Sequence, residues 1–314
     1  MKKIIVTGGA GFIGSAVIQE LQKFDHDIYV IDDLSFGNRK FIQIPDDKFF
    51  ETDILDKQAV SEIIEEIQPQ YIVHLAAVHF IPYCNQHPYK SANINLLGTI
   101  NIMEAAAKLT SLEKFFFATT AAVYPIYDEP IQENMATGPL DIYGLSKLTG
   151  EYLCSDFHQK TKIPTIVCRF FNAFGPNETN PHLIPEIQLQ VLKGKRTIEL
   201  GNLEPKRDFI HTYDMARAVR MLLEKFNDGM DIFNLGRGIE YSVVEIVEAF
   251  ARQIGEPIEI VQHPDRIRKS DRLHLLADIT KLKKATGWQP EISIDEGIGT
   301  LVKTESQLHY ETKS

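Results

Sequence analysis

Short apolar runs alternate with amphipathic stretches through the first half of the chain. Residues 57–67 show the helical pattern, with apolar side chains at Val60, Ile63, Ile64 and Ile67. The apolar runs between such stretches are continuous, which is typical of strands that are buried on both faces of a parallel sheet. The predicted strands are residues 3–8, 27–33, 48–53, 70–77, 113–120 and 164–172, and the predicted helices are residues 11–24, 57–67, 89–109 and 141–161.

After Phe174 the regular alternation of apolar runs and amphipathic stretches ends. Residues 175–185 read GPNETNPHLIP, a loop rich in turn formers. Shorter strands and helices follow, which predicts a smaller α/β lobe over the carboxyl edge of the sheet. We therefore predict an α/β fold with a Rossmann-type, doubly wound parallel sheet and a second lobe. The predicted boundaries are 1–173, with about 212–236 packing back, for the large domain, 174–211 and 237–300 for the lobe, and 301–314 for a C-terminal tail.

Composition and charge exclude several classes of protein function. The net charge of −10 argues against a nucleic-acid surface. Cys84, Cys154 and Cys168 are widely spaced without a CxxC pair, so we expect a cytoplasmic protein with neither a disulfide framework nor a metal site. No apolar run approaches the ~18 residues that a membrane-spanning helix needs.

A glycine-rich loop, VTGGAGFIGS, follows the first predicted strand and opens the first predicted helix. Gly9, Gly11 and Gly14 match G-x-G-x-x-G, and Gly8, Gly11 and Gly14 match the related G-x-x-G-x-x-G spacing. Such glycines allow a tight turn and a close approach of the backbone to a pyrophosphate at the helix N-terminus. The loop therefore predicts a dinucleotide site.

Acidic residues at the ends of the next two strands support this prediction. Asp32 follows the glycine loop by roughly 20 residues, where an acid holds the adenosine ribose. Because Asp32 and Asp33 would repel a 2′-phosphate, we expect NAD rather than NADP. Asp53 ends the third strand and is compatible with two roles, an acceptor for the adenine amine or the N-cap of the following helix.

The stretch IYGLSKLTGE places Tyr143 and Lys147 four residues apart on a predicted helix, so the two side chains share one face. A neighbouring ammonium favours phenolate and therefore lowers the pKa of a tyrosine. We expect Tyr143 to act as a general base on a sugar hydroxyl while a hydride passes to nicotinamide.

These ordered motifs resemble the extended branch of the short-chain dehydrogenase/reductase superfamily, and within it the NAD-dependent nucleotide-sugar epimerase/dehydratase family (UDP-galactose 4-epimerase-like). The similar segments are TGGAGFIG, HLAA, NLLGT, YGLSK, RFFNAFGP, LIP, RDFIH and TGWQP, which together span nearly the whole chain.

The resemblance implies roles for individual residues. Tyr143, Lys147 and Thr120 would be catalytic, with Thr120 hydrogen-bonded to the sugar hydroxyl. The residues expected to bind NAD are Gly8, Gly11, Phe12, Ile13, Gly14, Asp32, Asp33, Ser35, Asp53, Ile54, Leu75, Ala76, Ala77, Asn95, Thr119, Tyr143, Lys147 and Phe170. The residues expected to bind the nucleotide sugar are His79, Tyr83, Cys84, Thr120, Asn172, Leu183, Arg207, Arg268 and Asp271.

The residues after Thr120 discriminate between the reactions of this family. The 4,6-dehydratases carry Asp-Glu there as acid and base, whereas this chain has Ala121 and Ala122, which cannot transfer protons. The resemblance therefore implies a nucleotide-sugar 4-epimerase, with a UDP-sugar as the expected substrate.

Two enzymatic alternatives remain open, a dehydratase such as a 5,6-dehydratase and a reductase, both of which begin with the same oxidation at C4. His79, Tyr83 and Cys84 could serve a second proton transfer; alternatively, His79 packs on the ribose and Cys84 is a core residue. A non-catalytic NAD-binding sensor is a remote third possibility. The family also implies a homodimer in which the helices of residues 95–108 and 143–160 pair across a two-fold axis.

Overall fold

The computed structural model of the protein describes residues 1–264 and 272–311. Arg268 and Asp271, two of the predicted substrate residues, lie outside the described residues. Within the described part, no helix is long and apolar enough to cross a membrane.

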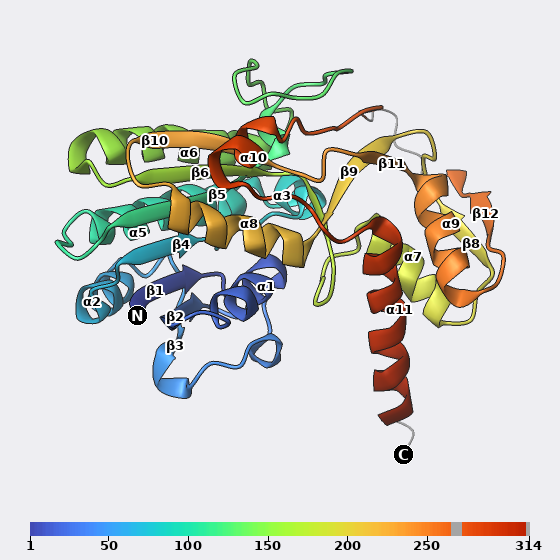
Figure 1. Ribbon diagram of the computed structural model, residues 1–314, viewed down its shortest axis with the longest axis horizontal. Coiled ribbons are helices and arrows are strands. Elements are labelled where there is room, and N and C mark those ends of the chain that lie inside the picture. Colours follow the sequence, from blue (N-terminus) through green and yellow to red (C-terminus); the bar gives the residue numbers. More distant parts are fainter. Residues whose placement is uncertain (265–271, 312–314) are drawn as a thin grey trace.

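A seven-stranded sheet, parallel throughout, forms the centre of the large domain (Figure 1). Its strand order is β10-β6-β5-β4-β1-β2-β3. Strands β2 and β3 lie on one side of β1 and the later strands lie on the other, so the carboxyl ends of β1 and β4 are neighbours. Six strands correspond to the predicted ones, and the seventh comes from the second half of the chain. The strands are β1 (Lys2–Thr7), β2 (His26–Asp32), β3 (Phe49–Glu51), β4 (Tyr71–His74), β5 (Lys114–Thr120), β6 (Thr165–Phe170) and β10 (Met230–Leu235).

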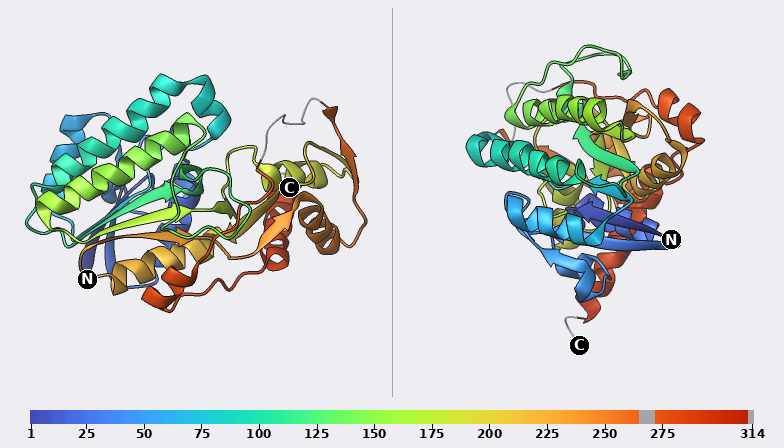
Figure 2. Two further views of the ribbon diagram at one scale, coloured as in Figure 1. Left: turned by 90° about the horizontal axis from the view of Figure 1, so that it is seen from above. Right: turned by 90° about the vertical axis from the view of Figure 1, so that its left-hand side faces the viewer.

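Helices cover both faces of this sheet (Figure 2). Side chains of β5 show the arrangement, because Phe116 packs into the core beneath α1 and α8, whereas Phe115 and Phe117 pack into the core beneath α2, α5 and α6. This alternation is the two-residue period of a strand with both faces buried. The helices are α1 (Phe12–Leu21), α8 (Thr212–Lys225), α2 (Lys57–Ile67), α5 (Thr99–Ala106) and α6 (Ile142–Thr161).

The predicted long helix of residues 89–109 is interrupted by a π-helical turn. The turn η3 (Asn93–Gly98) joins α4 (Pro88–Ala92) to α5. A Cβ atom at Gly98 would come within 2.4 Å of the Ile54 side chain, so the glycine lets the turn approach the loop after β3. Such π-turns re-aim side chains and are frequent near functional sites.

The smaller lobe has its own apolar core, built from helices and two short sheets. One sheet has the order β11-β9-β7, and the other pairs β12 with β8. Figure 1 shows α7, α9 and α11 grouped around β8 and β12, away from the large sheet. The elements are β7 (Asn172–Phe174), α7 (Leu183–Leu192), β8 (Thr197–Leu200), β9 (Lys206–His211), β11 (Glu240–Ser242), α9 (Val243–Ile254), β12 (Glu259–Gln262) and α11 (Ile294–Glu311).

The chain passes between the two domains more often than we predicted. Residues 275–288 return to the large domain, because Leu275, Leu282 and Trp288 belong to its core and the Trp288 indole donates to the Asp214 carbonyl. The predicted tail from residue 301 continues the helix α11 as far as Glu311. The remaining short elements are η1 (Arg39–Phe41), η2 (Asp46–Lys48), α3 (Ile81–Gln86), η4 (Ala121–Val123) and α10 (Thr280–Thr286).

His74, at the end of β4, joins the central sheet to its helical layer. Its Nδ1 lies 2.6 Å from the Thr7 hydroxyl on β1, and its Nε2 lies 2.9 Å from the Thr99 hydroxyl on α5. Complete burial, with a smaller contribution from the positive charge of Lys147, lowers the pKa of the imidazole to about 3. His74 is therefore neutral in the folded protein over the whole physiological range.

This burial predicts an acid-dependent loss of stability. In the unfolded chain the His74 imidazole binds a proton below about pH 6.5. In the folded protein the same imidazole binds a proton only near pH 3. His74 thus contributes stability that is present above pH 6.5 and is lost as the pH falls, by at most ~1.4 kcal/mol per pH unit. We expect the free-energy difference between wild type and His74→Gln, measured by urea unfolding from pH 7.5 to 4.5, to shrink towards acid. A constant difference would contradict this assignment.

Candidate active site

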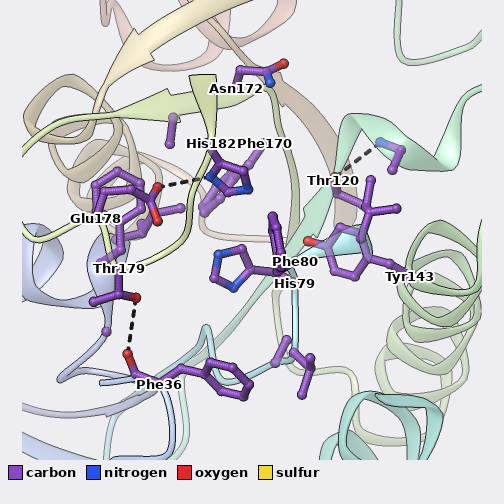
Figure 3. Close-up of a pocket in the computed structure, with 18 of the residues that line it drawn as sticks. Phe36, His79, Phe80, Thr120, Tyr143, Phe170, Asn172, Glu178, Thr179 and His182 are labelled. Carbon is purple, nitrogen blue, oxygen red and sulfur yellow. Dashed lines mark hydrogen bonds and ion pairs between the residues drawn. The ribbon is translucent and has the colours of Figure 1, made fainter. Parts of the chain in front are cut away.

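A cavity of about 820 Å³ lies at the carboxyl edge of the large sheet, between the two domains (Figure 3). Residues that follow β1, β2, β4 and β5 line one side, and residues from α7 and β9 line the other. Neighbouring parallel strands bring their carboxyl ends to one edge, which is where ligands bind in open α/β sheets. The sequence predicted a site at this edge.

The glycine loop forms a backbone cradle at one end of this cavity. Gly8 has a φ of +70°, and a Cβ atom there would lie 2.7 Å from the backbone nitrogen of Ala76. A Cβ atom at Gly14 would lie 2.1 Å from the carbonyl oxygen of Gly8. Only glycine fits these contacts, which leave the first N–H groups of α1 facing a space that suits a pyrophosphate.

The acidic residues after β2 line the same cavity. Asp32 is buried and accepts hydrogen bonds from the Ala10 and Leu34 N–H groups, each at 2.9 Å. Burial raises the pKa of its carboxyl group, and these backbone donors oppose the rise. Asp33 accepts from the backbone and hydroxyl of Ser35, at 3.0 and 2.7 Å.

The structure separates the two roles left open for Asp53. Asp56, not Asp53, caps the helix α2, with its side chain accepting from the Ala59 N–H. Asp53 instead accepts from the Leu55 N–H at 2.9 Å and lines the cavity. Its position at the carboxyl end of the third strand therefore agrees with contact to a bound adenine.

Tyr143 and Lys147 enter the cavity from the first turns of α6. Asp141 caps this helix by accepting from the Gly144 N–H at 2.7 Å. A Cβ atom at Gly144 would lie 2.4 Å from the carbonyl oxygen of Ala122, so the glycine lets α6 approach the end of β5. Helix and strand are thereby brought close together, and Tyr143 and Thr120 lie beside each other in the cavity (Figure 3).

The electrostatics of this pair differ from our prediction. Burial raises the pKa of Tyr143, and the hydrogen bond from Thr120 offsets only part of the rise. Burial also lowers the pKa of Lys147 to about 7, with its ammonium 4.2 Å from the centre of the Phe117 ring. The expected lowering of the tyrosine pKa by the lysine is therefore wrong, because desolvation dominates both groups.

Asn95, which we grouped with the cofactor-binding residues and expected to support the catalytic helices, is a buried support behind the cavity. Its Oδ1 accepts from the Val78 N–H at 2.8 Å, and its Nδ2 donates to the Val78 carbonyl at 3.0 Å. Nδ2 also donates to the Ser146 hydroxyl at 3.0 Å. Asn95 therefore connects the π-helical turn, the segment after β4 and the catalytic helix.

Two predicted substrate residues are not brought to the cavity. Cys84 is completely buried, its thiol donates to the Val78 carbonyl at 3.5 Å, and burial raises its pKa. Tyr83 packs edge-on against Phe36 and tilts over His87. Neither is found among the described residues that line the cavity, because the helical turn of α3 directs both side chains into packing contacts.

The other predicted site residues within the described part of the chain line the same cavity. His79 lies beside Phe80 at its centre and faces His182 (Figure 3). The predicted residues that line the cavity are Gly8, Gly11, Phe12, Ile13, Gly14, Asp32, Asp33, Ser35, Asp53, Ile54, Leu75, Ala76, Ala77, His79, Thr119, Thr120, Tyr143, Lys147, Phe170, Asn172, Leu183 and Arg207.

Sequence reasoning expected residues 179–185 to form part of the sugar pocket, but it assigned no role to the individual polar residues of the loop before α7. Glu178, Thr179 and His182 line the cavity, and the Glu178 carboxylate lies 3.3 Å from Nδ1 of His182. The ion pair with His182 helps to lower the pKa of Glu178 despite its burial. Turn-forming neighbours hid these residues, although an acid and a histidine spaced by four residues before an apolar helix were a usable signal.

Comparisons with known proteins agree with this geometry. The profile of the NAD dependent epimerase/dehydratase family matches residues 4–236. The UDP-glucose 4-epimerase of Bacillus subtilis (strain 168) is 33% identical over 320 residues, covering 93% of this chain and 94% of that protein.

Two solved structures share the fold over nearly the whole chain. The Thermotoga maritima UDP-glucose 4-epimerase with UDP-glucose has a TM-score of 0.89 and 28% identity, covering 98% of this chain and 99% of that one. The Thermus thermophilus UDP-glucose 4-epimerase in complex with NAD has a TM-score of 0.85 and 29% identity, covering 96% and 98%. The chain therefore belongs to the NAD dependent epimerase/dehydratase family.

Proposed function

We propose that the protein is an NAD-dependent nucleotide-sugar 4-epimerase that acts on a UDP-sugar by transient oxidation at C4. The observation that carries this proposal is the meeting of Thr120, Tyr143 and Lys147 in the cavity that also holds the glycine cradle. The similarity to UDP-glucose 4-epimerases supports the same reaction.

The end of β5 favours epimerisation over 4,6-dehydration. Ala121 and Ala122 occupy the positions next to Thr120, and both line the cavity. Neither methyl group can remove a proton from C5 or protonate a leaving hydroxyl. Of the three groups considered for a second proton transfer, Tyr83 and Cys84 are packed elsewhere, so the alternative dehydratase loses two of its three candidates.

The residues present fit NAD. The glycine cradle accommodates a pyrophosphate, Asp32 offers a carboxylate for a ribose diol, and Asp33 disfavours a 2′-phosphate. NAD supplies, when bound, an oxidised nicotinamide ring that takes up the C4 hydrogen with its electron pair and later returns it.

Tyr143 is the group that we assign to move the hydroxyl proton. Its phenolate oxygen takes the proton from the C4 hydroxyl during oxidation and returns it during reduction, while Thr120 holds the phenol in place. Because burial raises the pKa of Tyr143, the phenolate needs positive charge nearby. The Lys147 ammonium and the oxidised nicotinamide are the two sources of that charge in the proposed complex.

The other end of the cavity suits the diphosphate of a nucleotide sugar. Arg207, on β9, lines the cavity, and its Nη1 donates to the Lys206 and Arg272 carbonyls at 2.8 and 2.7 Å. These bonds orient the guanidinium, which can bind phosphate oxygens in pairs. Asn172 and the start of α7 at Leu183 border the same space.

We also propose that the protein is a homodimer. Helices α5 and α6 lie side by side on the outer surface of the large domain (Figure 2). Leu97, on the turn η3 before α5, is 50% exposed, and Leu145 and Tyr152, on α6, are 51% and 67% exposed. Exposed apolar side chains on neighbouring helices are typical of an interface between subunits.

A cytoplasmic location completes the proposal. All three cysteines are free and buried in the structure, which suits a reducing compartment. A UDP-sugar substrate, made from cytoplasmic nucleotides, fits the same location.

Tyr143→Phe tests the proposed chemistry. We expect kcat to fall by about 10²–10⁴, because the variant keeps the ring but cannot move the proton. The assay incubates enzyme and UDP-sugars in heavy water and separates the epimers by chromatography with mass detection. Wild type should return an isomer of unchanged mass without deuterium on carbon, and Tyr213→Phe on α8 should match it. Full activity of Tyr143→Phe would refute the assigned role, and loss of water from the sugar would replace the epimerase by a dehydratase.

Gly14→Ala tests the cofactor cradle. The added methyl group would meet the Gly8 carbonyl at 2.1 Å, so the loop must open and we expect loss of co-purifying NAD. Gly138→Ala is the matched control, since its nearest neighbour would lie at an ordinary 3.5 Å. The measurements are NAD released by acid from the purified proteins and their melting temperatures. A normal NAD content in Gly14→Ala would show that the cradle is not the pyrophosphate site.

Leu97→Asp combined with Tyr152→Asp tests the dimer. A buried unpaired carboxylate is costly at an interface, so we expect a monomer by size-exclusion chromatography with light scattering at micromolar concentration. Leu189→Asp on α7, where the leucine is also 50% exposed, should remain dimeric. A monomeric wild type, or a dimeric double variant, would exclude this surface as the interface.

A further inference from the structure

The loop between β7 and α7 of the smaller lobe lies beside the cavity and contacts the large domain. We call residues 175–182 the strap. Glu178 and Thr179 of the strap line the cavity, opposite Phe36 and His79 (Figure 3). The strap therefore forms part of the wall of the cavity that contains the glycine cradle.

Two side chains of the strap contact the nucleotide end of the large domain. The Asn177 amide donates to the Ser15 hydroxyl at 3.2 Å, in the first turns of α1. The Thr179 hydroxyl lies at a long 3.4 Å from the Phe36 carbonyl, in the loop after β2. Both contacts are partly open to water, so each is worth little by itself.

The third contact is more deeply placed, at the nicotinamide end of the cavity. The Asn180 amide nitrogen lies 3.1 Å from Nε2 of His79, which follows β4. An amide nitrogen can only donate, so Nε2 of His79 must be the acceptor and the imidazole must be neutral. Burial lowers the pKa of His79, which keeps the acceptor available at neutral pH.

Asn180 is anchored from its own side as well. It is only 7% exposed, its N–H donates to the Glu178 carboxylate at 3.0 Å, and its carbonyl accepts from the His182 N–H at 2.8 Å. The nearly buried Asn180 amide is held in place and contacts the His79 imidazole on the other side of the cleft, so this hydrogen bond fixes the strap to the large domain. The three contact points of the strap are Ser15 next to the glycine loop, Phe36 in the loop after Asp32, and His79 after β4.

We propose that Asn180 and His79 are positioning residues that latch the strap over the bound cofactor and slow its release. This retention has a purpose that rests on the proposed epimerase function. Epimerisation has no net redox change, so the reduced cofactor must stay until it has returned its hydride to the same sugar. Early release would leave a 4-keto sugar and an enzyme unable to finish the cycle.

The test measures release directly and uses no sugar. Wild type and variants are loaded with radiolabelled NAD, chased with excess unlabelled NAD, and sampled by rapid filtration. We expect Asn180→Ala and His79→Leu each to release NAD roughly fivefold faster, the effect of losing about one partly buried hydrogen bond. The double variant should release it no faster than either single variant, because both remove the same contact. His79→Gln, whose side-chain oxygen can accept from Asn180, should restore slow release.

Asn227→Ala, in the loop between α8 and β10, is the matched control and should release NAD at the wild-type rate. Release within twofold of wild type for both Asn180→Ala and His79→Leu would overturn the latch, as would additive effects in the double variant. If one variant fails to fold, the other and His79→Gln still decide the outcome. The release assay contains no sugar substrate, so it tests the latch independently of the reaction. If wild type released NAD slowly but converted no UDP-sugar, the epimerase proposal would be refuted and the latch would stand.

Discussion

The close contact between the glycine loop and the segment after β4 is the constraint on which the site depends. Gly8 touches the backbone of Ala76, and the carbonyl of Gly8 touches Gly14, with no room for a Cβ atom at either glycine. This contact brings the start of α1 down to the carboxyl edge of the sheet. The cradle, the acids after β2 and the catalytic helix then share one cavity because the strands beneath them are parallel and adjacent.

Desolvation dominates the chemistry inside that cavity. Tyr143 and Lys147 are each pushed towards the neutral form, so neither charge is prepared before ligands bind. A bound cofactor with a positive ring would change this balance in favour of phenolate. Proton removal by Tyr143 would therefore be favoured by the bound cofactor, which suits an enzyme whose oxidation step needs that cofactor.

A buried carboxylate holds the nucleotide-sugar side of the cleft in place. Asp208, on β9 next to Arg207, accepts from the N–H groups of Arg237, Gly238 and Ala277. Burial raises its pKa to about 6, so these donors only partly offset the cost of an ionised group there. The network joins β9 to the segment that returns to the large domain, and so the position of Arg207 is coupled to the main core.

Local pattern alone was enough for the first six strands, the glycine loop, Asp32 and the Tyr143–Lys147 pair, because period, turn chemistry and helix spacing are short-range properties. We expected residues of about 212–236 to pack back on the large domain, but local pattern could not predict that β10 pairs with β6 or that Trp288 returns to the large core, since both depend on which apolar surfaces remain uncovered after the first half has folded. Tertiary packing also turned Cys84 away from the cavity and brought Asn180 to His79 across 101 residues. The sequence thus determined the cofactor class and the candidate catalytic groups, whereas the burial and the proton affinities of those groups and the position of the strap were decided by long-range contacts.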